Sequence, residues 1–180
     1  MNLENRNDVS ILLSGEAGQG LQTLERILLR LFARSGFHVY SYSEVMSRIR
    51  GGNNSTEIRI STEPVSSYVS RIDIFIPLGP GAMNRFHDRI SGDTVIIGDP
   101  GNIDSSYHDG NHRVIVLPIR ENAEAVGGAL YANVVTLGIL AGIFNLDQSL
   151  VESVLRTSFT KSSDDIILKN QDASRKGFSE

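Results

Sequence analysis

Apolar residues recur along the chain with two different periods, and this pattern predicts an alternation of strands and helices. Residues 9–14 form a short apolar run typical of a buried strand. Residues 21–35 repeat apolar positions at the three- and four-residue spacing of an amphipathic helix. Gly36 stands just after this stretch, where a glycine commonly ends a helix. The chain therefore opens as a strand followed by a helix.

Strands and helices continue to alternate toward the C-terminus. We predict strands at 37–40, 94–98 and 113–117, and a buried strand at the near-continuous apolar run 72–78. We predict a short helix at about 81–88, an apolar helix at 133–144, a helix at 147–158 and a polar last helix at 161–177. Residues 56–61 alternate in period two, and residues 65–69 are suited to return as their antiparallel partner. We therefore predict one domain over residues 1–180, an α/β three-layer sandwich whose mostly parallel sheet carries an antiparallel hairpin near residues 56–69.

Composition and charge narrow the class of protein. The chain has 180 residues, of which 40% are hydrophobic and 21% charged, as in ordinary globular proteins. The absence of cysteine excludes disulfides, a cysteine nucleophile and thiolate-bound iron–sulfur clusters on this chain. A net charge of −4 gives no overall attraction to nucleic acid. No apolar run reaches the roughly twenty residues of a membrane span, and the polar start does not resemble a secretory signal, so we expect a cytoplasmic protein.

The first candidate site is the glycine-rich turn between the first strand and the first helix. Backbone N–H groups at a helix N-terminus can hold a phosphate or another anion, and glycines let the backbone approach it closely. The predicted anion-binding residues are Gly15, Gly18, Gln19 and Gly20. Their spacing differs from G-x-G-x-x-G, and no Lys-Ser/Thr follows, which disfavours a dinucleotide site and a phosphate-loop nucleotidase. The alternative is that these glycines only let the strand pack against the helix.

The second candidate site is a basic, glycine-rich loop. Guanidinium and amide groups beside two glycines form a suitable anion-binding loop. The predicted residues are Arg48, Arg50, Gly51, Gly52, Asn53 and Asn54. A solvated turn between two strands is the alternative, but loops of this length more often serve a function.

Three further residues carry weaker signals. Glu44 follows the second predicted strand and fits a ribose-binding acid only approximately. His108 and His112 are four residues apart, but Gly110 between them indicates a surface turn, and a third metal ligand is missing. We therefore predict no metal site, and no pattern in the sequence identifies catalytic residues.

Taken in order, these segments resemble the gamma subunit, or gamma-type domain, of 2-oxoacid:ferredoxin oxidoreductases. That family opens with a strand, a glycine turn ending in G-Q-G and a helix, which residues 11–20 resemble. It then carries an R-G-G segment and a strand containing V-R-I-S, matched here by residues 48–54 and 57–61. Further matches lie at 64–67, 72–78 and 133–138. Each motif alone is weak, but the ordered set spans essentially the whole chain.

The resemblance implies a subunit that is inactive alone, within a complex that oxidatively decarboxylates a 2-oxo acid to an acyl-CoA and passes the electrons to ferredoxin. It implies thiamine diphosphate, magnesium and iron–sulfur clusters on partner subunits of alpha, beta and delta (ferredoxin-like) type. This chain would help assembly and contact coenzyme A, and the isolated chain could form a homodimer. No nucleic acid or membrane partner is expected. The alternatives are a stand-alone Rossmann-like protein that binds a nucleotide or S-adenosylmethionine, and a scaffold that binds no ligand.

Overall fold

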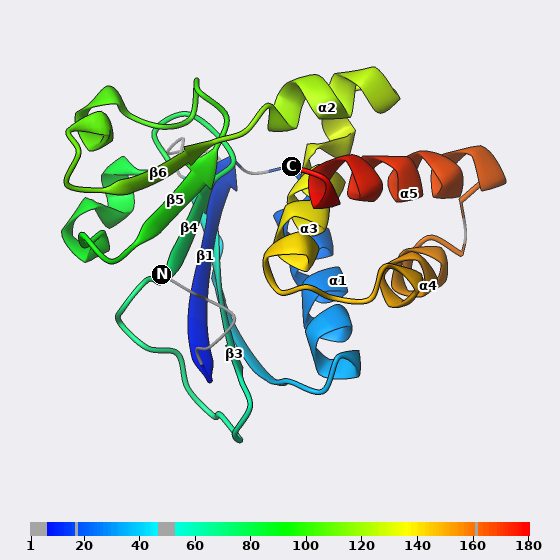
Figure 1. Ribbon diagram of the computed structural model, residues 1–180, viewed down its shortest axis with the longest axis horizontal. Coiled ribbons are helices and arrows are strands. Elements are labelled where there is room, and N and C mark those ends of the chain that lie inside the picture. Colours follow the sequence, from blue (N-terminus) through cyan, green and yellow to red (C-terminus); the bar gives the residue numbers. More distant parts are fainter. Residues whose placement is uncertain (1–6, 17, 47–52, 161) are drawn as a thin grey trace.

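A six-stranded sheet forms the centre of the protein (Figure 1). The computed structural model describes residues 7–16, 18–46, 53–160 and 162–180. In these ranges the strands are β1 (Asp8–Glu16), β2 (His38–Glu44), β3 (Asn53–Ser61), β4 (Ile74–Pro77), β5 (Val95–Gly98) and β6 (Arg113–Val116), in the order β2-β3-β1-β4-β5-β6. The pairs β1–β4, β4–β5 and β5–β6 are parallel, whereas β3 is antiparallel to β1 and to β2. The predicted α/β class and mostly parallel sheet are confirmed.

The antiparallel part of the sheet differs from the prediction. Ile58 of β3 lies opposite Ser41 of β2 on one side and opposite Ile11 of β1 on the other. Residues 65–69 are described throughout and form no strand, so the predicted hairpin at 56–69 is wrong. The physical reason is burial: β3 is covered along most of its length, so it needs a neighbour on each side. The segment after Pro64 is mostly exposed and cannot supply one.

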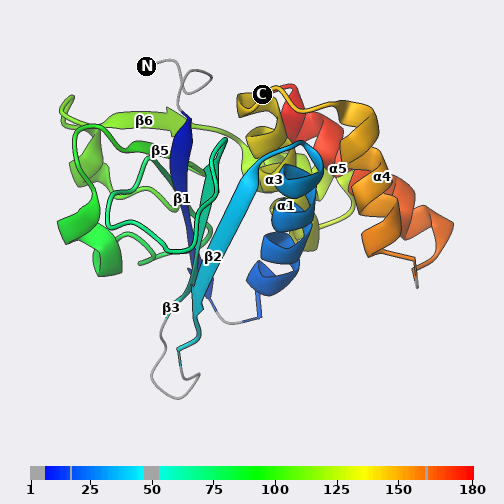
Figure 2. The same ribbon diagram turned by 90° about the horizontal axis from the view of Figure 1, so that it is seen from below.

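The α-helices of the described ranges lie on one face of the sheet (Figures 1 and 2). They are α1 (Leu21–Arg34), α2 (Ile119–Val126), α3 (Ala132–Ile143), α4 (Gln148–Ser158) and α5 (Asp164–Phe178). The four long helices were predicted to within a few residues, and Gly36 follows α1 with φ +90°, as expected for a helix end. Helix α2 was not predicted, and the helix predicted at 81–88 is the 3₁₀ segment η3 (Asn84–Arg89).

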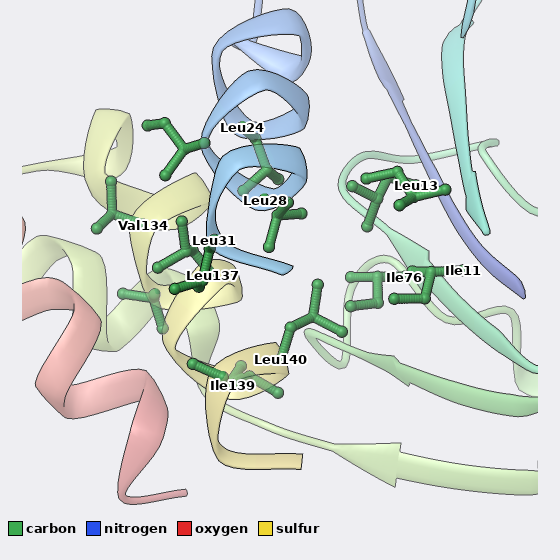
Figure 3. Packing of buried hydrophobic residues seen from close by; sticks show 14 of the residues in the cluster. Ile11, Leu13, Leu24, Leu28, Leu31, Ile76, Val134, Leu137, Ile139 and Leu140 are labelled. Carbon is green, nitrogen blue, oxygen red and sulfur yellow. The ribbon is translucent and has the colours of Figure 1, made fainter. Parts of the chain in front are cut away.

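The larger hydrophobic cluster lies between the sheet and these helices (Figure 3). It brings together Leu24, Leu28 and Leu31 of α1, Val134, Leu137, Ile139 and Leu140 of α3, and Ile11, Leu13 and Ile76 of the sheet. On its far side α3 packs against α5 with backbone in contact with backbone. A Cβ atom added at Gly138 would overlap the carbonyl oxygen of Ser174, and one added at Gly177 would overlap that of Val135. Glycine is therefore required at both positions of this helix contact.

The opposite face of the sheet carries a smaller cluster under 3₁₀ segments and loops. Leu12, Phe75 and Ile96 of the sheet pack there with Met83 and Phe86. This face is also held by ion pairs, which join Arg89 to Glu57, Arg59 to Asp8 and Arg71 to Asp73. The sheet is thus covered on both sides, which gives the three layers of the predicted sandwich.

Within the described part of the chain, no single helix is both long and apolar enough to cross a membrane. The segments 119–126 and 129–143 together meet such a test by length and composition, but they are bent by 119° relative to each other. The second of them contains α3, whose residues 134–141 are buried in the core.

Candidate functional site

The glycine turn lies where β1 ends and α1 begins, at the carboxyl edge of the parallel strands. Gly18 has φ +100° and Gly20 has φ +78°, both in the left-handed region that favours glycine. Gly20 stands at the N-cap of α1 and has no side chain to cap the helix. The first turn of α1 contains no acidic residue either. Backbone N–H groups at the start of α1 are therefore open to an anion.

Two amide side chains fix the shape of this turn. The Oε1 atom of Gln19 accepts a hydrogen bond from the Glu16 N–H at 2.9 Å. The Nδ2 atom of Asn133, at the start of α3, donates to the carbonyl oxygen of Gln19. A Cβ atom at Gly15 would overlap Gln19 Oε1, so Gly15 makes room for this bracing side chain. Gln19 and Gly15 thus shape the turn, and their contact with an anion stays a prediction.

Asn133 was not predicted as a site residue. It begins the segment 133–138 that matches the family, but that match assigned it no contact. Its role depends on α3 meeting a turn that is 114 residues away along the chain. Such a contact follows from the fold and could not be inferred from spacing.

The end of β3 brings part of the second predicted site to the same place. Asn54 lies opposite Gly15, and Asn53 lies opposite Glu16. Both side chains form hydrogen bonds with nearby backbone groups. Asn54 Oδ1 accepts from the Met46 N–H at 2.9 Å, and Asn53 Nδ2 donates to the Pro80 carbonyl at 3.4 Å. The remaining predicted residues of that loop, namely Arg48, Arg50, Gly51 and Gly52, lie outside the described residues.

Two cavities flank the glycine turn. The first, called here the uncharged cavity, measures about 530 Å³ and is bounded by the turn, α1, η5 (Ala129–Tyr131), α3 and α5. Its described lining contains no charged side chain; the polar lining residues are Gln19, Thr23, Asn133, Ser162 and Asn170. The second, called the acidic cavity, measures about 340 Å³ and is bounded by the turn, the start of α1 and the ends of β2 and β3.

The described lining of the acidic cavity carries only negative charges. They belong to Glu16 and Glu44. Glu44 is ion-paired with Arg85 and accepts a hydrogen bond from the Tyr42 hydroxyl at 3.1 Å, which raises the pKa of Tyr42. Close by, Glu25 accepts a hydrogen bond from the Ser43 hydroxyl at 2.8 Å. Among the described groups, an anion bound at the turn is therefore repelled less on the side of the uncharged cavity than on the side of the acidic cavity.

Asp99 near the same edge, and His112 at the opposite edge, where it precedes β6, both make structural contacts. The Asp99 carboxylate follows β5 and accepts hydrogen bonds from the Arg120 N–H at 3.1 and 3.2 Å, capping α2. Burial raises the pKa of Asp99, although these hydrogen bonds oppose the shift. His112 contacts Asp109 at 3.1 Å. Over the described ranges, no three His, Asp or Glu side chains form a group that could hold a metal ion.

Comparison with known proteins adds to this geometry. The family model for pyruvate ferredoxin/flavodoxin oxidoreductase matches residues 10–180. The 2-oxoglutarate synthase subunit KorC of Archaeoglobus fulgidus is 24% identical over 161 residues, which cover 88% of this chain and 83% of that protein.

Two solved structures share the fold. One is the 2-oxoglutarate:ferredoxin oxidoreductase from Magnetococcus marinus with 2-oxoglutarate, coenzyme A and succinyl-CoA bound, with a TM-score of 0.86 and 23% identity over 97% of this chain. This chain spans only 31% of the length of that one. The other is the keto/oxoacid ferredoxin oxidoreductase gamma subunit from Geobacter sulfurreducens, with a TM-score of 0.73 and 20% identity, covering 95% of this chain and 96% of that one. The predicted resemblance is confirmed, and the chain belongs to the pyruvate ferredoxin/flavodoxin oxidoreductase family.

Proposed function

We propose that this chain is a gamma-type subunit, folded as a single domain, of a 2-oxoacid:ferredoxin oxidoreductase complex, and that it binds coenzyme A at the glycine turn. In that reaction the 2-oxo acid loses carbon dioxide, and its acyl group replaces the hydrogen of the coenzyme A thiol. The thiol hydrogen is released as a proton, and two electrons pass to oxidised ferredoxin. The observation that carries the proposal is the uncapped start of α1, which opens beside the uncharged cavity. Coenzyme A bound in the Magnetococcus enzyme supports the choice of ligand.

The turn suits a phosphate of coenzyme A for two reasons. Backbone N–H groups at the start of α1 carry partial positive charge, and Gly20 leaves them unobstructed by a capping side chain. The positive φ angles of Gly18 and Gly20 hold the backbone in a turn that other residues adopt only with strain. The role of this chain is therefore to bind and orient coenzyme A, while the partner subunits carry the electron carriers.

The stand-alone Rossmann-like alternative is not favoured. That fold places parallel strands on both sides of the first strand. Here β1 has the parallel strand β4 on one side and the antiparallel strand β3 on the other. The family match over residues 10–180 also accounts for the β3 segment, which the alternative does not.

The proposed partners are alpha, beta and delta (ferredoxin-like) subunits in the cytoplasm, with a homodimer as the form of the isolated chain. Leu130 and Ile166 support a protein partner on this side. Both line the uncharged cavity, and their side chains are exposed, Leu130 by 74%. Large apolar side chains gathered at one place on a surface commonly mark an interface.

A matched pair of glycine substitutions tests the proposal. Gly18→Ala and Gly36→Ala both place a side chain at a positive φ, one before α1 and the other after it. Each should cost about 1 kcal/mol in stability. Only Gly18→Ala should raise the coenzyme A concentration that gives half-maximal acyl-CoA formation by the reconstituted complex. Equal coenzyme A dependence of the two variants would assign the turn to packing alone.

The predicted arginine loop adds a second test. We propose that Arg48 or Arg50 contacts a phosphate of coenzyme A, on the basis of their residue types and neighbours. Such a charge-assisted contact contributes about 1.5–3 kcal/mol, so Arg50→Ala should weaken apparent coenzyme A affinity about ten- to a hundredfold. Arg50→Lys should recover part of the loss, because lysine keeps the charge but not the paired hydrogen bonds. An unchanged coenzyme A dependence in an intact complex would contradict this role.

A further inference from the structure

The last strand of the sheet, β6, leaves its outer side open. Among the described strands β6 pairs only with β5 (Figure 1). Just after it, the Leu117 N–H donates to the Gly98 carbonyl at the end of β5 at 3.0 Å. Because the backbone groups of successive residues in a strand point to alternate sides, those of Val114 and Val116 point away from β5. The outer edge of β6 therefore offers two N–H and two C=O groups to another strand.

Apolar side chains are exposed on both faces of this edge. Ile115 lies opposite Ile97 of the larger cluster, so it belongs to the helical face, and Val116 belongs to the other face. Both are 44% exposed. Ile115 also lines a cavity of about 150 Å³, called here the edge cavity, together with Phe178 and Glu180. Soluble proteins usually protect a strand edge with charges, bulges or a covering segment, so an open apolar edge indicates pairing with another strand.

We propose that β6 pairs antiparallel with β6 of a second copy of this chain and so forms the homodimer proposed above for the isolated chain. The inference rests on that part of the proposed function and is independent of coenzyme A. A twofold axis perpendicular to the sheet keeps the helical faces of both copies on one side. With Ile115 opposite itself at the axis, Val114 of each copy lies opposite Val116 of the other. These two pairs exchange N–H···O=C bonds, so all outward groups of β6 gain a partner.

The two nearest registers of this kind fit less well. An axis at Val116 places Val114 opposite Pro118, which has no N–H to donate. An axis at Val114 places Val116 opposite His112, which precedes the strand. Only the axis at Ile115 pairs the outward residues of β6 with each other, and it sets apolar side chains opposite apolar side chains on both faces.

Charged side chains favour a second copy as the partner. Arg113 lies opposite Val95 and therefore on the helical face, and its side chain has no ion pair or hydrogen bond with the described residues. In the proposed register it lies opposite Leu117 of the second copy, which lines the edge cavity with Glu180. The Glu180 carboxylate accepts from Asn122 but has no described cation beside it. The symmetry thus brings Arg113 toward Glu180 of the other copy twice, with no like charges facing each other.

The first test places a charge at the axis. Sedimentation of the full chain over a range of concentrations measures the dimer Kd. Ile115→Lys sets two ammonium groups opposite each other and removes two apolar contacts, so the Kd should rise about thirtyfold or more. Leu168→Lys, which replaces an exposed apolar residue of α5 outside the edge cavity, is the matched control and should leave the Kd unchanged. A wild-type chain that stays monomeric, or an unchanged Kd for Ile115→Lys, would overturn the inference.

The second test exchanges charges between copies and does not touch the apolar strand. Arg113→Glu and Glu180→Arg should each raise the dimer Kd about tenfold, because an exposed contact contributes up to about 1 kcal/mol and the symmetry makes each change count twice. An equimolar mixture of the two variants should form a heterodimer as tight as the wild-type dimer, since opposite charges then meet at both contacts. A mixture that associates no better than its components would contradict the register.

Hydrogen exchange distinguishes strand pairing from other contacts. The amides of Val114 and Val116 should exchange more slowly as the chain concentration is raised, whereas that of Ile115, which points to β5, should not change. Uniform exchange rates at these three positions at all concentrations would contradict the pairing.

The two proposals fail in different ways. If the chain alone is monomeric and Ile115→Lys instead blocks assembly of the complex, β6 pairs with another subunit and the inference is wrong, while the glycine turn keeps its proposed role. If Gly18→Ala leaves the coenzyme A dependence unchanged but Ile115→Lys separates the dimer, the coenzyme A site is lost and the pairing of β6 stands.

Discussion

The two faces of the sheet are stabilised in different ways. Along β3, Ile58 and Ile60 belong to the cluster under the helices, whereas Glu57 and Arg59 form ion pairs on the opposite side. On the helical side, the packing is so close that the backbones of α3 and α5 are in contact at glycines. On the other side, bidentate arginine contacts supplement a small apolar cluster. We infer that the helical face is intolerant of added volume and the opposite face is intolerant of lost charge.

The largest loss of stability is expected from a substitution on the helical side. Gly177→Ala places a Cβ atom on the carbonyl oxygen of Val135, so α3 and α5 must move apart. Overpacking of this kind should lower the free energy of unfolding by about 3 kcal/mol. Gly101→Ala is the matched control, because a Cβ atom there meets no other atom within 4 Å. Denaturant unfolding of both variants measures the difference, and a loss below about 1 kcal/mol for Gly177→Ala would contradict a rigid helix contact.

The next largest loss of stability is expected from a substitution on the opposite side of the sheet. Arg89 donates to both carboxylate oxygens of Glu57 at 2.7 Å, and the Glu57 side chain is only 8% exposed. Arg89→Met leaves that carboxylate nearly buried without its partner, which should cost about 2 kcal/mol. The double variant Arg89→Met with Glu57→Gln should recover part of the loss, because no unpaired charge remains. Strictly additive losses in this double-mutant cycle would show that the ion pair does not stabilise this face.

The smallest expected effect is a change in how the stability of the opposite side depends on pH. The hydrogen bond from Arg59 lowers the pKa of Asp8 below its usual 3.8. A carboxyl whose pKa is lowered on folding stabilises the protein above its unfolded pKa, and this contribution is lost as the pH falls through the lowered value. Asp8→Asn should therefore flatten the acid limb of stability against pH, by about 1 kcal/mol.

The pKa of Asp99 is shifted in the opposite direction, so its contribution to stability should change with pH in the opposite sense. Burial raises its pKa above 3.8, so its contribution to stability declines as the pH rises from 3.8 through the raised value. Asp99→Asn keeps an acceptor for α2 and should remove this decline. If both variants changed the pH profile in the same direction, local pKa shifts could not be the cause.

Much of the fold followed from periodicity because those elements bury one face. The apolar spacing of residues 21–35 identified α1, whose packing depends on that spacing, and the apolar run at 133–144 identified α3, which is buried along residues 134–141. Strand pairing was harder, since β3 takes both of its antiparallel partners, β2 and β1, from the chain before it and none from the segment after Pro64. The helix α2 was missed because it is eight residues long and buries only Ile119 and Ala123.

The candidate site was predictable only in part. The glycine turn was identified because strand, glycines and helix are consecutive in sequence. Its contact with the end of β3 depends on the antiparallel pairing of β1 and β3, which brings Asn54 opposite Gly15. Asn133 and Asn170, which line the uncharged cavity, come from α3 and α5, and only tertiary structure brings both residues to one cavity. The roles of Arg48 and Arg50 stay predictions.

The packing of α5 against α3 has a consequence for biosynthesis. Asn170, which closes one wall of the uncharged cavity, and Gly177, which allows the close helix contact, both belong to the last helix of the described chain. The ribosome makes the glycine turn early and this wall late. The turn is therefore in place on the nascent chain before any cavity can form beside it, and the cavity closes only when the helix that carries Asn170 has left the exit tunnel.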